Sequence, residues 1–234
     1  MRNTEELSAK HLNLKLDRHP FKWVLDTFKG GFESSKEVSL NFSKYSYSPR
    51  KIEDERFCFC SPLESLNIDY LVQLLSSLEQ DKDLAIHSVI NVDDKVLHIP
   101  MIDFGMKNIS DFSIPPIKKF IEYWDMDFAI FSSGRSYHAY GNRLLPEKDW
   151  IKFMGSLLLL NEPGGRKVID TRWIGHRILA GYSALRLSCN ALQYKSYPKT
   201  FSKNLYMLSN VIAREAIIHP SRTIYAERNK FKKF

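Results

Sequence analysis

The sequence predicts an α+β fold in which a mostly antiparallel sheet is backed by helices. Two patterns indicate this fold class: several stretches alternate apolar and polar residues, as half-buried strands do, and others repeat apolar residues every three or four positions, as amphipathic helices do. A third observation is the size and composition of the chain. Its 234 residues are 44% apolar and 26% charged, which is enough to bury a sizeable core and excludes a disordered chain.

The first part of the chain is predicted to form an N-terminal α/β extension. PFKWVLDTF at 20–28 predicts a short helix, and EVSLNFSKYSYS at 37–48 alternates like a half-buried strand. RFCFC at 56–60 follows as another strand. Its alternation of cysteine with phenylalanine favours a buried structural strand over a zinc site, because no partner ligands are spaced to complete one. The pattern becomes more regular near residue 65, so the extension is assigned to residues 1–65.

Residues 66–220 are predicted to form the core domain, and residues 221–234 a basic, aromatic C-terminal tail. The helices expected in the core have apolar residues at helical spacing or begin with proline and acidic residues; they span 68–80, 115–124, 146–161, 171–179 and 204–217. The expected strands are rich in β-branched and aromatic residues; they span 83–92, 95–104, 127–133, 137–140 and 183–188. Asp93 and Asp94 are predicted to form a tight turn, so the first two of these strands are expected to pair as a hairpin.

The cysteine content and the apolar runs indicate where the protein is expected to reside. Three cysteines are too few for a dense disulfide framework, which favours a reducing compartment. The N-terminus is polar and lacks the apolar core of a signal peptide, and the longest apolar stretch, Leu157 to Leu160, is far too short to span a bilayer. We therefore expect a soluble, cytoplasmic protein with no membrane partner.

The charge balance favours polyanionic partners. Lysine and arginine number 34 against 27 acidic residues, a formal net charge of +7. Part of the excess lies in RTIYAERNKFKKF at 222–234, where basic and aromatic residues are mixed. This composition suits phosphate contacts combined with base stacking, and it equally suits a solvated tail.

Three segments concentrate polar groups at the ends of predicted strands. The first, HIPMIDFG, contains Asp103, and the second, FSSGRSYHAYG, contains an arginine, a serine and a histidine in close succession. The third, VIDTRWIGHRILAGYSALRLS, opens with Asp170 and contains several arginines. A glycine-arginine turn offers backbone amides and a guanidinium group, both of which suit a phosphate ligand. Asp170 also begins a helical pattern, so the role of helix N-cap competes about evenly with a functional one.

Across roughly residues 85 to 190, the order of these residues resembles the archaeo-eukaryotic primase superfamily, the primase-polymerases. That family has three motifs: DxD on a strand, SxH on the next sheet element, and a hydrophobic residue followed by aspartate. Asp103 falls at the first motif, Ser136-Tyr137-His138 matches the second, and Ile169-Asp170 matches the third. The stretch Leu185-Arg186-Leu187-Ser188 is similar to the one that follows the third motif. The resemblance implies an RRM-like catalytic core.

The resemblance further implies template-directed nucleotidyl transfer, in DNA replication or repair, on nucleoside triphosphates and on DNA or RNA. Asp103 and Asp170 would be the catalytic residues that hold Mg²⁺ or Mn²⁺. The residues implied to bind the nucleotide and its phosphates are Arg135, Ser136, His138, Arg177, Arg186 and Ser188. Since no helicase segment is visible, unwinding would need a helicase or another partner protein.

The sequence departs from the family at the first motif, where DxD has become Asp103-Phe104-Gly105. One expected metal ligand is missing, so the site is either reduced to one strong metal position or no longer catalytic. A literal DxD occurs at 125–127, but it lies only eleven residues before His138, and the register from Asp103 leaves room for the intervening helix. Two hypotheses follow: a metal-dependent nucleotidyltransferase, and a degenerate primase-fold module that binds nucleic acid or nucleotide within a larger assembly.

Overall fold

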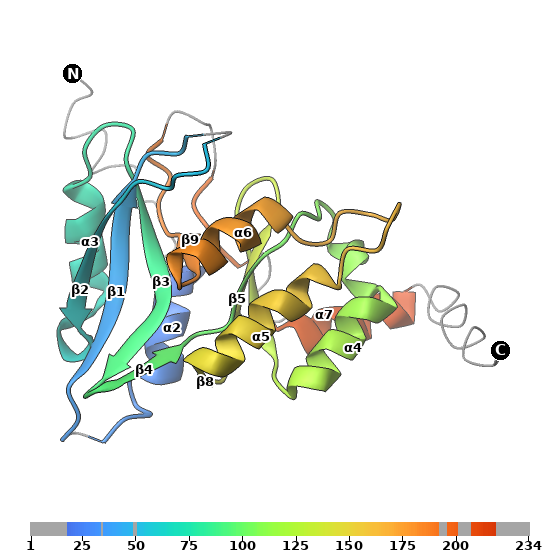
Figure 1. Ribbon diagram of the computed structural model, residues 1–234, viewed down its shortest axis with the longest axis horizontal. Coiled ribbons are helices and arrows are strands. Elements are labelled where there is room, and N and C mark those ends of the chain that lie inside the picture. Colours follow the sequence, from blue (N-terminus) through green and yellow to red (C-terminus); the bar gives the residue numbers. More distant parts are fainter. Residues whose placement is uncertain (1–17, 34, 49–50, 192–195, 201–206, 219–234) are drawn as a thin grey trace.

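Two antiparallel sheets with helices around them make up the fold, which confirms the predicted α+β class. The computed structural model describes residues 18–33, 35–48, 51–191, 196–200 and 207–218 (Figure 1). The predicted tail at 221–234 lies outside these residues. Within the described part of the chain, no helix is long and apolar enough to cross a membrane.

The first sheet has β3 (Asp83–Val92) at its centre. β1 (Val38–Tyr45) pairs with β3 on one side and with β2 (Arg56–Pro62) on the other. The remaining strands of this sheet are β4 (Lys95–His98), β8 (Leu145–Pro146) and β9 (Ala184–Arg186). β3 and β4 form the predicted hairpin, with Asp93 in the left-handed region at φ 50°. Strands from the predicted N-terminal extension and from the predicted core therefore share one sheet.

The predicted strand at 95–104 is wrong as a single element, because it divides at Ile99 and Pro100. Pro100 has no N–H to donate to a strand ladder, and its carbonyl accepts a hydrogen bond from Gly141 N at 2.8 Å. Beyond this point the chain enters a second sheet as β5 (Met101–Asp103). The division at the proline is what carries Asp103 away from the β3–β4 hairpin.

The second sheet has the order β5-β7-β6 and lies between two hydrophobic clusters. β6 (Phe128–Ser132) and β7 (Tyr137–Gly141) form a hairpin, as predicted. Successive side chains of a strand point to opposite faces of its sheet. Accordingly, Met101 and Phe131 pack into the first cluster, and Ile102 and Ile130 pack into the second.

The helices pack in two groups, each against one of the two hydrophobic clusters. The predicted helices are present as α2 (Pro20–Phe28), α3 (Ile68–Ser76), α4 (Pro115–Trp124), α5 (Glu147–Leu158), α6 (Thr171–Ala180) and α7 (Leu208–Ile218). Short 3₁₀ turns occur at Leu63–Ser65 and Ile109–Ser113. α2 and α3 pack into the first cluster and α4 and α5 into the second, and Figure 1 shows α5 between the first sheet and α4. α3 ends at Ser76, one turn earlier than the predicted end at residue 80.

The prediction that the cysteines of β2 are buried is wrong. β2 is the edge strand of the first sheet, and Cys58 and Cys60 are both exposed. Phe57 is 70% exposed, whereas Phe59 is partly buried against the first cluster. An edge strand is paired on one side only, so fewer of its side chains are covered than in the predicted buried strand.

Candidate functional site

A cleft of about 470 Å³ collects seven of the eight predicted site residues. This volume lies within the range of about 300–1,000 Å³ that is usual for small-molecule sites. The cleft is lined by the segment between β1 and β2, the end of β5, the turn between β6 and β7, the first half of α6, and β9. The predicted residues that line it are Asp103, Arg135, Ser136, His138, Asp170, Arg177 and Arg186.

Backbone pairing brings the three motif positions together. Asp103 on β5 is paired directly with His138 on β7. Asp170 N donates a hydrogen bond to Asp103 O at 3.1 Å, beside an antiparallel bridge between Phe104 and Ile169. The His138 side chain is 8% exposed, and its Nε2 lies 3.8 Å from Asp103 Oδ1. The preferred register, from Asp103 to His138, is therefore the one that the fold uses.

Asp170 is the N-cap of α6 and also lines the cleft. Its side chain caps α6 by accepting hydrogen bonds from the backbone amides of Arg172, at 3.1 Å, and Trp173, at 3.4 Å. The carboxylate also lines the cleft and is 36% exposed. Lys167 Nζ lies 3.4 Å from Asp170 Oδ1, the same oxygen that caps the helix.

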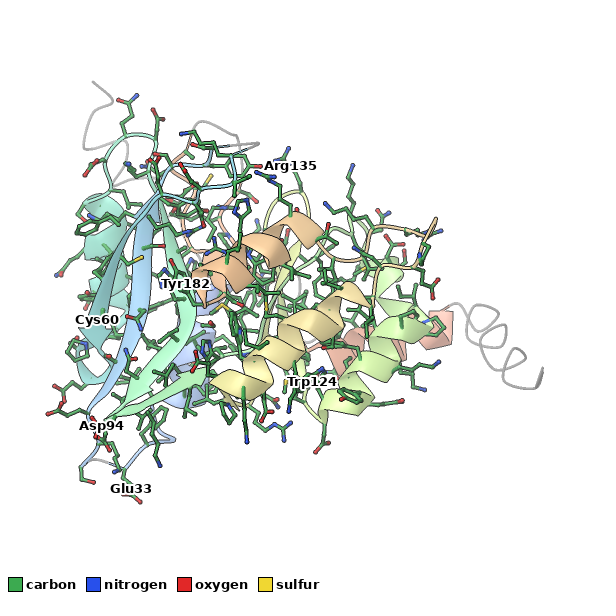
Figure 2. The ribbon with its side chains drawn as sticks, in the orientation of Figure 1. Glu33, Cys60, Asp94, Trp124, Arg135 and Tyr182 are labelled. Carbon is green, nitrogen blue, oxygen red and sulfur yellow. The ribbon has the colours of Figure 1, made fainter. Side chains whose placement is uncertain are left out.

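The turn between β6 and β7 presents Arg135 at the cleft. Gly134 has φ 107°, a conformation that strongly favours glycine, and Ser133 N donates to Ser136 O at 2.9 Å across the turn. Arg135 is exposed. Figure 2 shows it close to α6, at the opposite side of the molecule from the β3–β4 turn that carries Asp94.

Arg186 and Ser188 have partners within the protein. The Arg186 guanidinium donates to Ser133 O at 2.7 Å, to Ser196 O at 3.0 Å and to Ser188 O, so it holds β9 against the β6–β7 turn while it lines the cleft. The Ser188 side chain is fully buried, donates to Asp83 Oδ1 and accepts from Leu84 N. Ser188 is the predicted site residue that does not line the cleft.

Arg177 belongs to an ionic triad that the sequence analysis missed. Asp54 Oδ2 accepts a hydrogen bond from Arg56 Nε at 2.7 Å and pairs with Arg177 Nη2. The exposed fractions of these side chains are 24% for Asp54, 10% for Arg56 and 2% for Arg177. Burial lowers the pKa of both guanidinium groups, which nevertheless stay charged. One carboxylate is thus paired with two guanidinium groups, so the triad has a net positive charge and lies in the wall of the cleft.

The cleft as a whole has a surplus of positive charge. Eight lysine and arginine side chains line it, against five acidic ones. A concave surface with one prevailing sign of charge attracts ligands of the opposite sign. The cationic lining residues that the sequence analysis missed are Lys51, Arg56, Lys107, Lys167 and Arg172. The position of Lys167 three residues before Asp170 was a usable sequence signal, whereas nothing in the sequence connects Arg56 to Arg177.

The residues of the site do not fit a pair of divalent cations. Within the described part of the chain, no cluster of three or more histidine, cysteine, aspartate or glutamate residues is arranged to hold a metal ion. A Cβ atom at Gly105 would lie 2.9 Å from Lys167 Cγ, so a second motif carboxylate at this position would require the lysine stem to move. Two divalent cations need several oxygen ligands to offset their charge, and this site offers Asp103 and Asp170 beside an ammonium group.

The literal DxD at 125–127 has a structural role. Asp125 is the C-cap of α4 and has a left-handed φ of 46°. Asp127 accepts hydrogen bonds from the backbone and the side chain of Ser209 at the start of α7. Neither aspartate lines the cleft.

Comparison with known proteins places these residues in a family. The model of the family described as archaeo-eukaryotic primase 1D-like matches residues 62–199, more than half of the chain. The match includes Asp103, His138 and Asp170, and it excludes Asp54 and Arg56. Neither the curated proteins nor the solved structures provide a match to the chain. The family match confirms the resemblance carried by the three motifs: this chain belongs to the archaeo-eukaryotic primase 1D-like family.

Proposed function

We propose that this primase-like chain is a module that binds nucleotides or nucleic-acid ends through their phosphate groups, in the cleft between the two sheets. The observation that carries the proposal is the surplus of cationic side chains around the family's motif positions. A phosphate chain carries several negative charges over a short length. Such a ligand gains most from a cleft that surrounds it with guanidinium and ammonium groups.

The arginine and lysine side chains that line the cleft differ in burial and in bonding, so they contribute to phosphate binding in different ways. Arg135 and Lys107 are exposed and lie where a ligand enters, so they make the first contacts with its phosphates. Arg177 and Arg56 are largely buried and fixed by Asp54, so they add a preorganised positive potential deeper in the wall. Arg186 positions the β6–β7 turn, because its donors are used by backbone carbonyl groups.

Calorimetric titration of the full chain with ATP tests this proposal, with Arg135→Gln as the variant and Arg143→Gln as the matched control. Arg143 is exposed and donates to Trp124 O, away from the cleft. Loss of one charged hydrogen bond to a phosphate is expected to raise the Kd about tenfold in Arg135→Gln. Arg143→Gln should keep the wild-type Kd. Equal affinities in both variants, or no binding by the wild type, would contradict the proposal.

Metal-dependent nucleotidyl transfer with Mg²⁺ or Mn²⁺ is the second candidate function, and the adjacency of Asp103 and Asp170 favours it. Primer extension and de novo synthesis on a single-stranded template, with labelled nucleotides, test it. Asp103→Asn and Asp170→Asn are suitable variants, since asparagine at position 170 still caps α6. Product that disappears in both variants would establish an enzyme. No product from a wild-type chain that binds ATP would leave the binding module as the function.

A further inference from the structure

We propose that Lys167 supplies from within the protein the positive charge that a divalent cation would supply between Asp103, Asp170 and a phosphate ligand. Phosphate binding in this cleft then needs no metal ion. This inference rests on the proposed phosphate-binding function, and it assigns to Lys167 a role that neither the family motifs nor the sequence pattern gave it.

The stem of Lys167 occupies the space beside Gly105. The chain after β5 runs antiparallel to residues 168–170, with Gly105 N donating to Val168 O at 2.8 Å. This pairing sets Gly105 beside the stem of Lys167. A Cβ at Gly105 would meet Lys167 Cγ at 2.9 Å and its Cδ and Cε at 3.1 Å. With the Lys167 side chain in this conformation, the position that would hold the second carboxylate of a DxD motif has room only for glycine.

The ammonium group of Lys167 places a positive charge beside Asp170. The Lys167 ammonium lies 3.4 Å from Asp170 Oδ1, and the backbone N–H of Asp170 donates a hydrogen bond to Asp103 O. A divalent cation approaching the same oxygen would be repelled by the ammonium group. The carboxylate oxygen also accepts two amide hydrogen bonds at the start of α6, which reduces its capacity for a further ligand.

The side chain of Lys167 is accessible to a ligand in the cleft. The Lys167 side chain is 57% exposed and lines the cleft, so a phosphate in the cleft can contact it. Lysine is a compact point charge with three donors, which suits a phosphate oxygen from several directions. Asp170 holds this charge in place when the cleft has no ligand.

Calorimetric titration with inorganic tripolyphosphate, once in EDTA and once in Mg²⁺, tests the proposal on the full chain. The wild type is expected to bind at least as tightly in EDTA as in Mg²⁺. Lys167→Met keeps most of the stem and removes the charge, so it should bind about tenfold more weakly in EDTA and regain affinity in Mg²⁺. Lys148→Met is the control for net charge, because Lys148 is exposed on α5 and lies outside the cleft. It should behave as the wild type does.

The outcomes separate this inference from the function on which it rests. Wild-type binding that requires Mg²⁺ would overturn the inference and leave the phosphate-binding function intact. An unchanged ratio of the two affinities in Lys167→Met would also overturn it. Absence of wild-type binding under both conditions would refute the phosphate-binding function and the inference together. Paramagnetic detection of bound Mn²⁺ gives a second readout: Lys167→Met should bind the ion more tightly than the wild type does.

Discussion

Replacement of Asp54 by asparagine is expected to destabilise the fold strongly. The carboxylate of Asp54 is paired with the guanidinium groups of Arg56 and Arg177, whose side chains are only 10% and 2% exposed. Asparagine keeps the size of the side chain and removes its charge. Two buried cations would then face each other without a counterion.

The magnitude follows from the burial of the triad. Removing one partner of a buried ion pair costs about 3–5 kcal/mol, because the remaining charge is left desolvated and uncompensated. Asp54 is itself 24% exposed, so water can partly replace it. We therefore expect the lower end of that range, about 3 kcal/mol. This is a large share of the stability of a typical domain, about 5–15 kcal/mol.

Urea denaturation at neutral pH measures this effect, with Asp26→Asn as the matched control. Asp26 pairs with Lys22 one helical turn away on α2, and these side chains are 61% and 41% exposed. An exposed pair of this kind is worth about 0.3–0.5 kcal/mol. If Asp54→Asn lowers the free energy of unfolding no more than Asp26→Asn does, the triad is not a buried electrostatic unit and our account of the cleft wall is wrong.

Two further predictions concern acid sensitivity and metal binding. Burial lowers the pKa of His19 from 6.5 to about 4, and the neutral ring accepts from Phe21 N and contacts Leu187 O. The unfolded chain takes up the proton first as the pH falls, so this histidine should reduce the free energy of unfolding between about pH 6.5 and 4, by about 1.4 kcal/mol per pH unit. Urea denaturation of His19→Asn over that range should show a shallower pH dependence than the wild type. The double variant Gly105→Asp/Lys167→Ala removes the lysine stem beside position 105 and restores the motif carboxylate, so it should bind Mn²⁺ more tightly than the wild type does, measured by paramagnetic resonance.

Each of these two predictions has a result that contradicts it. An acid dependence of stability identical in His19→Asn and in the wild type would show that His19 is not held neutral by the fold. For the metal site, the single variant Lys167→Ala is the control. Equal Mn²⁺ affinity in the single and double variants would mean that a carboxylate at position 105 does not reach the site.

The order of elements was predictable because each has a local signal. Pro115 and Pro116 mark the start of α4, for example, and the alternation of apolar residues marks β1. The motif register from Asp103 to His138 was also predictable, since the chain between them accommodates the intervening helix, whereas the pairing of their strands was not. Local signals failed at Pro100, where a run that looks like one strand is divided between two sheets.

The cleft residues that could not be predicted from the sequence depend on contacts between segments that are distant in the chain. Asp54 and Arg177 are far apart in sequence, and their pairing is set by how the segment after β1 folds over α6. Nothing local distinguishes Asp54 from its acidic neighbours. The burial of Arg177 was equally hidden, because an arginine in a helix is usually solvated. Lys167 was close to a recognised motif, but its effect depends on the backbone register that sets it against Gly105.

Hydrogen–deuterium exchange of the full chain with and without ATP tests the central claim most directly, because it locates the bound nucleotide. Our account predicts slower amide exchange in residues 133–138, which cover the β6–β7 turn and the start of β7, and in residues 167–177, which lead into α6 and form its first two turns, when ATP is present. Protection confined to the basic C-terminal segment at 222–234, with these two regions unchanged, would contradict the claim that the cleft is the nucleotide site.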